Sequence, residues 1–151
     1  MATTLEARLL EDMKAAMKSG DKLRLETIRG LRSQLKNKQI EKGAELSEDE
    51  VLQVLMSAVK RRREAIEQYR AGGREDLVEK ESRELEIIQS YLPQPLSQEE
   101  LNQIIEEAIQ TAQASSPRDM GKVMGLVMPR VKGRAEGKLV QQLVREKLAG
   151  A

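Results

Sequence analysis

The sequence contains no cysteine and no histidine, and only 1% of its 151 residues are aromatic. Without these two residue types there is no disulfide, no thiol nucleophile, no imidazole base and no zinc site that uses them as ligands. The lack of cysteine is typical of a reducing compartment. No apolar run approaches the roughly 20 residues that cross a bilayer, and the N-terminus lacks the apolar segment of a signal peptide. We therefore expect a cytoplasmic protein that does not enter a membrane.

The shortage of aromatic side chains also restricts the core. Tyr69 and Tyr91 are the two aromatic residues, so aliphatic side chains, methionine and alanine must fill the interior. This composition favours helices packed on helices over a β-sandwich. The 26 basic and 25 acidic residues give a formal charge of +1, which excludes a strong overall field toward nucleic acid. An anionic partner would have to meet a local patch.

Apolar residues recur at helical spacing throughout the first 92 residues and predict about four helices. Gly20 ends the first, and Asp21 caps the second. The second helix is expected to give way to a polar turn at KNKQIEKGAEL. A capping box, Ser47-Glu48-Asp49-Glu50, opens the third helix, which ends at Gly72-Gly73. The fourth covers about residues 74–92.

A domain boundary is predicted at YLPQPLSQEEL, because two prolines two residues apart forbid a continuous helix. The resulting division is an N-terminal domain over 1–92, a Pro-rich linker over 93–96 and a tail domain over 97–151. Three helices are expected in the tail. The first follows a capping box at Ser97, the second ends at Pro129, and the third covers about 137–148. The fold class is all-α: a helical N-terminal domain plus a small three-helix C-terminal domain.

The tail contains a glycine-rich stretch, MGKVMGLVMPRVKGRAEGKLV. Its spacing does not match a Walker A loop, and no strand precedes it, so a dinucleotide fingerprint is excluded too. Gly121 and Gly125 lie four residues apart, on one helical face, where we expect them to let another backbone approach closely. Three methionines with the same spacing are expected to pack in the core.

The segment 130–138 carries four positive charges against one negative charge. Backbone N–H groups at the start of the last helix would add to an anion-attracting surface. The predicted nucleic-acid-binding residues are Lys122, Arg130, Lys132, Arg134 and Lys138. The alternative is a solvated turn whose charges contact no partner.

Other charged clusters give weaker predictions. Lys60-Arg61-Arg62-Arg63 is the densest basic run, but a helix spreads it around the circumference, which favours a solvated surface over a nucleic-acid site. Acidic groups lie in first turns or on exposed faces, where helix capping explains them. No catalytic residue, metal ligand or cofactor is predicted.

The motifs SYLPQPLSQEEL and DMGKVMGLVMPRVKGRAEGKLV resemble the GatB/YqeY family. The opening, LLEDMKAAMKSGDKLRLETIRGLRSQLKNKQIEKG, is similar to free-standing YqeY-like proteins. The tail resembles the C-terminal domain of the B subunit of the tRNA-dependent amidotransferase. One departure is Glu136, where the family usually has aspartate; the charge is kept.

The resemblance implies a two-domain helical protein and a tail implicated in tRNA binding. It also links the family to carbon–nitrogen ligase activity with glutamine as amido-N-donor, although the catalytic domain of the amidotransferase has no counterpart in this sequence. The first functional hypothesis is a non-catalytic accessory module that binds tRNA or other RNA. The alternatives are a protein–protein adaptor in translation and a ligase that acts only with other subunits.

Overall fold

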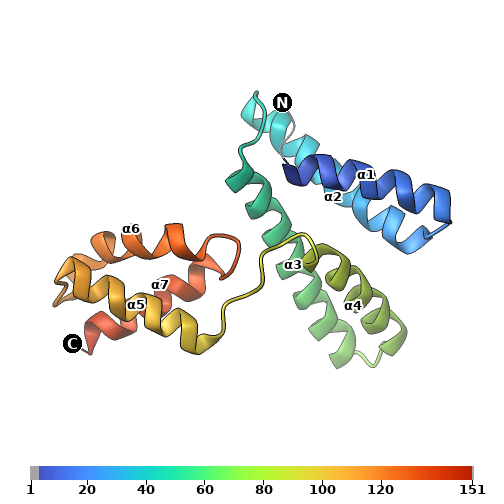
Figure 1. Ribbon diagram of the computed structural model, residues 1–151. Helices are drawn as coiled ribbons and strands as arrows, with labels where there is room; N and C mark the ends of the chain where they lie inside the picture. Colours follow the sequence, from blue (N-terminus) through green and yellow to red (C-terminus); the bar gives the residue numbers. More distant parts are fainter. Residues whose placement is uncertain (1–3, 151) are drawn as a thin grey trace. The chain divides into compact units, whose positions relative to one another are not determined.

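The computed structural model describes residues 4–150, and within this range every regular element is helical (Figure 1). The elements are α1 (Thr4–Ser19), α2 (Lys22–Lys42), α3 (Glu48–Ala71), α4 (Glu75–Gln89), α5 (Gln98–Ala112), the 3₁₀ turn η1 (Pro117–Asp119), α6 (Met120–Val131) and α7 (Gly137–Ala149). The all-α prediction is confirmed. The chain divides into two compact units, Met1–Pro93 and Gln94–Ala151.

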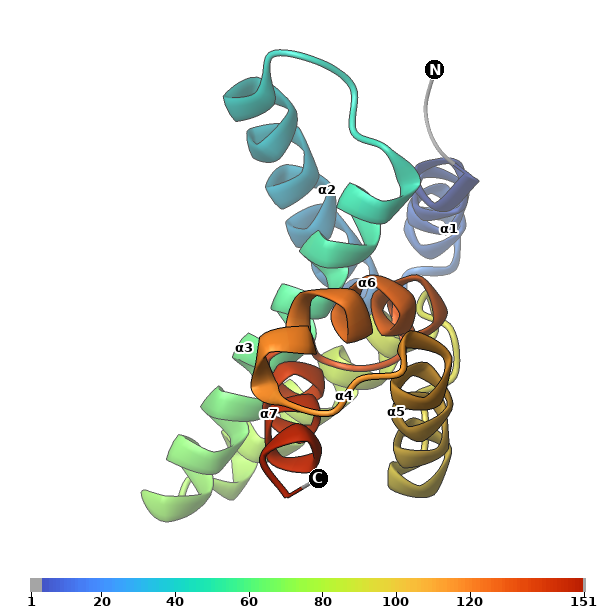
Figure 2. The same ribbon diagram turned by 90° about the vertical axis from the view of Figure 1, so that its left-hand side faces the viewer.

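Two helical hairpins build the first unit, α1 with α2 and α3 with α4 (Figures 1 and 2). The predicted boundaries hold at Gly20, which has φ +75°, and at the Ser47–Glu50 capping box, in which both reciprocal hydrogen bonds form. The hairpins share one apolar core, which includes Leu9, Ile28, Leu31, Leu55 and Ile88.

Helix α2 is longer than the sequence pattern predicts. The segment KNKQIEK was expected to be a turn, but it continues the helix to Lys42, and Gly43 then ends the helix with φ +74°. Lysine, glutamine and glutamate are good helix formers and need no buried stripe of their own. Gln39 also donates a hydrogen bond of 3.4 Å to Glu6 of α1. The helical spacing of apolar residues stops after Leu35 because the buried face of α2 ends there. The helix itself continues for two more turns.

Tyr91 attaches the end of the first unit to α1. Its side chain is 3% exposed, its hydroxyl donates a hydrogen bond to Asp12, and the guanidinium of Arg8 lies 5.0 Å from the ring centroid. Burial, followed by the hydrogen bond to Asp12, raises the pKa of the Tyr91 hydroxyl. One aromatic residue thus joins two elements that lie 79 positions apart in the sequence.

The second unit is a three-helix assembly of α5, α6 and α7 around its own apolar core, which includes Ile105, Val123, Val127, Val140 and Val144. Ser97 caps α5 by accepting a hydrogen bond from the N–H of Glu100. The second hydrogen bond of the predicted capping box, from the N–H of Ser97 to the Glu100 carboxylate, is not part of this cap. The Glu100 carboxylate lies 3.9 Å from the guanidinium of Arg134 instead.

Pro129 does not end α6, contrary to the prediction. The helix runs on to Val131 with Pro129 inside it. Proline removes the hydrogen bond to the carbonyl four residues earlier, which belongs to Gly125. Because Gly125 is exposed, water can meet that carbonyl. The completely buried side chains of Val127 and Val131 hold the last turn against the core.

None of the helices within residues 4–150 is both long enough and apolar enough to cross a bilayer.

Candidate nucleic-acid interface

The five predicted nucleic-acid-binding residues come from three adjoining elements of the second unit. Lys122 and Arg130 lie on α6, Lys132 and Arg134 lie in the turn that follows, and Lys138 lies in the first turn of α7. The basic segment 130–138 is therefore not one loop. Only residues 132–136 connect the two helices.

The turn between α6 and α7 is held by several hydrogen bonds. The N–H groups of Arg134 and Ala135 both donate to the carbonyl of Val131, at 2.9 and 3.1 Å. Gly133 is buried and has φ +73°, a conformation that disfavours other residues. The turn also fixes the start of the unit, because the N–H of Leu96 donates to the carbonyl of Arg134 at 3.0 Å.

The two arginines of the predicted set have partners within the second unit. Arg130 donates a hydrogen bond of 2.8 Å to Glu107 of α5, and this bond lowers the pKa of the Glu107 carboxyl. Arg134 donates from Nε to the carbonyl of Gln94 at 3.0 Å. Both guanidinium groups thus contribute to the contacts between elements, which the sequence did not predict.

The three lysines of the predicted set, Lys122, Lys132 and Lys138, are exposed. The N–H of Ser115 donates a hydrogen bond to the Asp119 carboxylate, which is the main cause of the lowered pKa of Asp119, and the charge of Lys122 adds to it. Helix α7 begins beside Lys138, and its N-cap residue makes no side-chain capping hydrogen bond. Helix N-termini and lysine side chains both favour anions.

Within residues 4–150, the glycines of α6 do not pack against another helix, so that prediction is wrong. Gly121 and Gly125 are exposed, and a Cβ atom at either position would have nothing within 4 Å. One face of α6 carries Gly121, Gly125 and Pro129 at intervals of four residues. The adjacent row on the same helix carries Lys122, Leu126 and Arg130. The methionines were predicted to pack in the core, and the structure places Met120, Met124 and Met128 partly buried against it.

Replacing both glycines by alanine is expected to stabilise the second unit by about 1–2 kcal/mol, because glycine in a helix interior costs about 0.5–1 kcal/mol relative to alanine. Urea unfolding of G121A/G125A against the unmodified chain measures the gain. A loss of stability would show that another backbone does approach this face.

The sequence interpretation missed a basic helix in the first unit. Helix α2 has seven basic and two acidic residues, which makes it the most positively charged helix of the chain. For Lys60–Arg63, the densest basic run, the sequence favoured a solvated surface. In the structure Arg62 lies 3.5 Å from Glu84, with 20% and 13% of the two side chains exposed. Counting charges over each predicted helix would have found α2, because even the part up to Leu35 holds four basic residues and one acidic residue.

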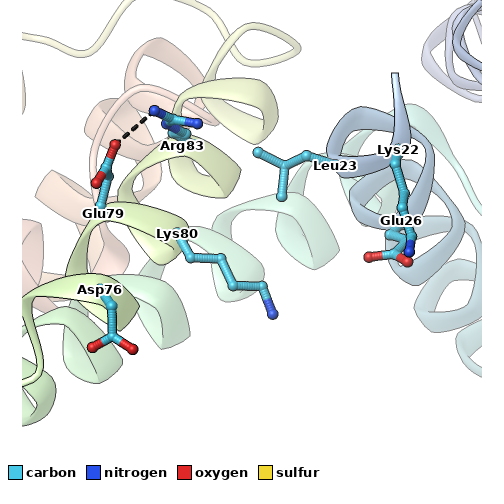
Figure 3. Close-up of a pocket in the computed structure, with 7 residues that line it drawn as sticks. All are labelled: Lys22, Leu23, Glu26, Asp76, Glu79, Lys80 and Arg83. Atoms are coloured by element: carbon cyan, nitrogen blue, oxygen red, sulfur yellow. Dashed lines mark hydrogen bonds and ion pairs between the residues drawn. The ribbon is translucent and has the colours of Figure 1, made fainter. Parts of the chain in front are cut away.

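A hollow of about 460 Å³ separates α2 from α4 (Figure 3). Leu23 points into it, and Lys80 extends from α4 toward α2, while Arg83 is already paired with Glu79 at 2.6 Å. It is lined by Lys22, Leu23, Glu26, Asp76, Glu79, Lys80 and Arg83. Three basic and three acidic groups balance each other around one apolar side chain, so the hollow selects for neither charge.

Fold and surface together define an all-helical protein of two compact units, with a basic surface on a small three-helix tail. The sequence matches the YqeY-like protein family over residues 6–148, and the chain belongs to that family.

Among curated proteins, the chain is similar to "Altered inheritance of mitochondria protein 41, mitochondrial" from several yeasts. The Lachancea thermotolerans protein is 43% identical over 89 residues, 58% of this chain and 48% of the relative. The Kluyveromyces lactis protein is 41% identical over 86 residues, 56% and 46% of the two chains. A Saccharomyces cerevisiae protein is 36% identical over 101 residues, 65% and 55%. The chain spans about half the length of these relatives.

Proposed function

We propose that this protein is a non-catalytic accessory module that binds tRNA or another RNA through the basic surface of its second unit. The observation that carries the proposal is that α6, the turn after it and α7 each carry an exposed lysine, namely Lys122, Lys132 and Lys138. Membership of the YqeY-like family, whose tail resembles the amidotransferase B subunit, supports it.

The surface suits phosphates better than bases. No aromatic residue lies in the second unit, because both tyrosines precede residue 94. Base stacking normally uses aromatic side chains. Lysines act as mobile point charges that meet phosphate oxygens without selecting a sequence. Binding is therefore expected to be salt-dependent and largely insensitive to sequence.

Replacing Lys122, Lys132 and Lys138 by alanine is expected to reduce the salt dependence of tRNA binding. Each phosphate contact contributes about 0.7–0.9 to the slope of log K against log salt. Three lost contacts lower that slope by about 2–3. Fluorescence anisotropy with labelled tRNA, over about 50–200 mM salt, measures the change.

The control variant is R130A/R134A, which removes two cations that already hold carboxylate or carbonyl partners. We expect it to change stability more than tRNA affinity. Absence of tRNA binding by the unmodified chain at low salt would refute the proposal, as would equal slopes for the lysine variant and the unmodified chain.

A second candidate is a protein–protein adaptor in translation. The observation that favours it is the apolar part of the α6 surface, where Leu126 is 40% exposed beside Gly121 and Gly125. A partner captured after RNase treatment, and lost in Leu126→Glu, would support this function. For either candidate the proposed compartment is the cytoplasm, which a fluorescent fusion would test against the mitochondrial location in the relatives' names.

A further inference from the structure

The exposed side of α2 carries a row of cations that the fold leaves without anionic partners. Arg29, Arg32 and Lys36 follow one another at spacings of three and four, so they share one face of the helix. All three are exposed. Across residues 4–150, none of them has a carboxylate within 4 Å; the polar contact of Arg32 is a 3.2 Å approach of Nη1 to Met13 Sδ.

Neighbouring cations on the same helix are different in this respect. Arg24 lies 3.4 Å from Asp21, Lys38 lies 3.7 Å from Glu41, and Lys42 contacts Glu50 at the far end of the helix. Among the described residues, the cations of the middle of α2 therefore form a continuous partnerless row, and Lys22 at the first position of the helix also has no carboxylate within 4 Å. Like charges three and four residues apart destabilise a helix, so the fold itself gains nothing from this row.

The residues beside the row are small or neutral. Gly30 has open space where a Cβ would stand, and Ser33 and Asn37 are exposed polar residues. Protein interfaces rely on buried aromatic and apolar anchors, and here the apolar contribution is Ile40, 71% exposed in the last turn. The chemistry fits a phosphate backbone better than a protein surface.

The dimensions agree with a phosphodiester backbone. Residues 29–36 rise about 10 Å along the helix, at about 1.5 Å per residue. A duplex carries one negative charge per about 1.7 Å of its axis, so several phosphates fall within reach of the three side chains. Serine and asparagine are also common donors to phosphate oxygens.

We infer that the Arg29–Arg32–Lys36 face of α2 is an RNA-binding surface that contacts the phosphate backbone. The inference rests on the proposed function in that it takes the same ligand, but it uses different residues in the other unit. RNA would then be contacted by both units, and each would contribute its own share of the salt dependence.

The test compares charge reversals in the full chain. Arg29→Glu/Lys36→Glu changes the formal charge by −4, and Arg61→Glu/Arg63→Glu makes the same change at two exposed positions of α3, a helix whose basic and acidic residues balance. With labelled tRNA, the α2 variant is expected to lose about tenfold or more in affinity. Its salt slope should fall by about 2, because each phosphate contact contributes about 0.9. The α3 variant should bind much as the unmodified chain does.

Thermal unfolding excludes a trivial loss of structure. The new glutamates stand three and four residues from Arg32, where opposite charges stabilise a helix, so the melting temperature should stay the same or rise. Weaker binding by a variant that is at least as stable supports a surface contact.

Each remaining outcome is decisive. If the α2 variant binds as well as the unmodified chain while the Lys122/Lys132/Lys138 variant is impaired, the α2 surface is refuted and the tail function stands. If only the α2 variant is impaired, the tail function fails and the α2 surface stands. Equal losses in the α2 and α3 variants would refute a specific α2 surface, and an unmodified chain that binds no tRNA would refute both.

Discussion

Replacing Tyr91 by alanine is expected to lower the free energy of unfolding of the first unit by about 3–5 kcal/mol, the range for large aromatic side chains removed from a core. The ring is buried, and the hydroxyl reaches Asp12 of α1. Alanine would remove the apolar contacts, the cation–π contact with Arg8 and the hydrogen bond together. Urea unfolding followed by circular dichroism measures the loss.

Phenylalanine at the same position separates packing from hydrogen bonding. Tyr91→Phe keeps the ring but leaves the Asp12 carboxylate without this donor, so we expect a smaller loss of about 1–3 kcal/mol. A double-mutant cycle with Asp12→Asn isolates the coupling between the two groups. A loss below about 1 kcal/mol for Tyr91→Ala would contradict a core role for the ring, since buried aromatic truncations cost several times more.

The raised pKa of Tyr91 adds a pH dependence with a definite sign. The folded chain holds the phenolic proton more tightly than the unfolded chain does. The stabilisation from this hydroxyl is therefore complete at neutral pH and declines as the pH rises above about 10, the ordinary tyrosine pKa. Tyr91→Phe should remove that part of the alkaline loss of stability.

Much of the fold could be predicted because the helix ends are set by capping interactions between residues that are close in the sequence. Asp21, Ser47 and Ser97 each accept a hydrogen bond from the first turn of the helix that follows, and Gly20 adopts a positive φ at the end of α1. Such caps depend on a few neighbouring residues and need no tertiary contact. The division into two units was likewise predicted from local chemistry, because Pro93 and Pro95 forbid a continuous helix.

The errors arose where a tertiary or solvent effect overrides a local rule. A proline such as Pro129 normally stops a helix, but Gly125, whose carbonyl loses its helical donor, is an exposed residue, and the buried Val131 holds the next turn. Gly121 and Gly125 have the spacing of a close-packing face, yet spacing alone does not say whether that face meets a neighbour or water. The direction of the α6 face was fixed by Val123 and Val127, which are completely buried.

The predicted site shows a similar division. Sequence identified the cations of the tail, but it could not show that Arg130 and Arg134 are bound to partners from α5 and the linker. Pairing across 23 or 40 positions depends on the helix arrangement, which charge counts do not contain. Whether the three lysines bind RNA stays a prediction.

Replacing Ile105 by alanine is expected to destabilise the second unit by about 2–5 kcal/mol, because truncating a buried isoleucine removes apolar contacts and leaves a cavity. Ile105 is 0% exposed in α5, at the centre of a core made only of residues from this unit. The unit is small, and stability amounts to about 0.05–0.15 kcal/mol per residue. One truncation therefore removes a large part of its total stability, and hydrogen exchange should show the amides of α5–α7 losing protection while those of α1–α4 keep theirs.

The matched control is Ile109→Ala, one turn further along α5, where the side chain is only partly buried and the loss should be clearly smaller. The same pair of variants also tests the proposed division of RNA binding between the units. Under conditions that unfold the second unit of Ile105→Ala, the salt slope should lose the contribution proposed for Lys122, Lys132 and Lys138, and the contribution proposed for the α2 face should remain. Equal loss of protection in both units would show that the two cores unfold as one, and it would remove the basis for assigning separate contributions to them.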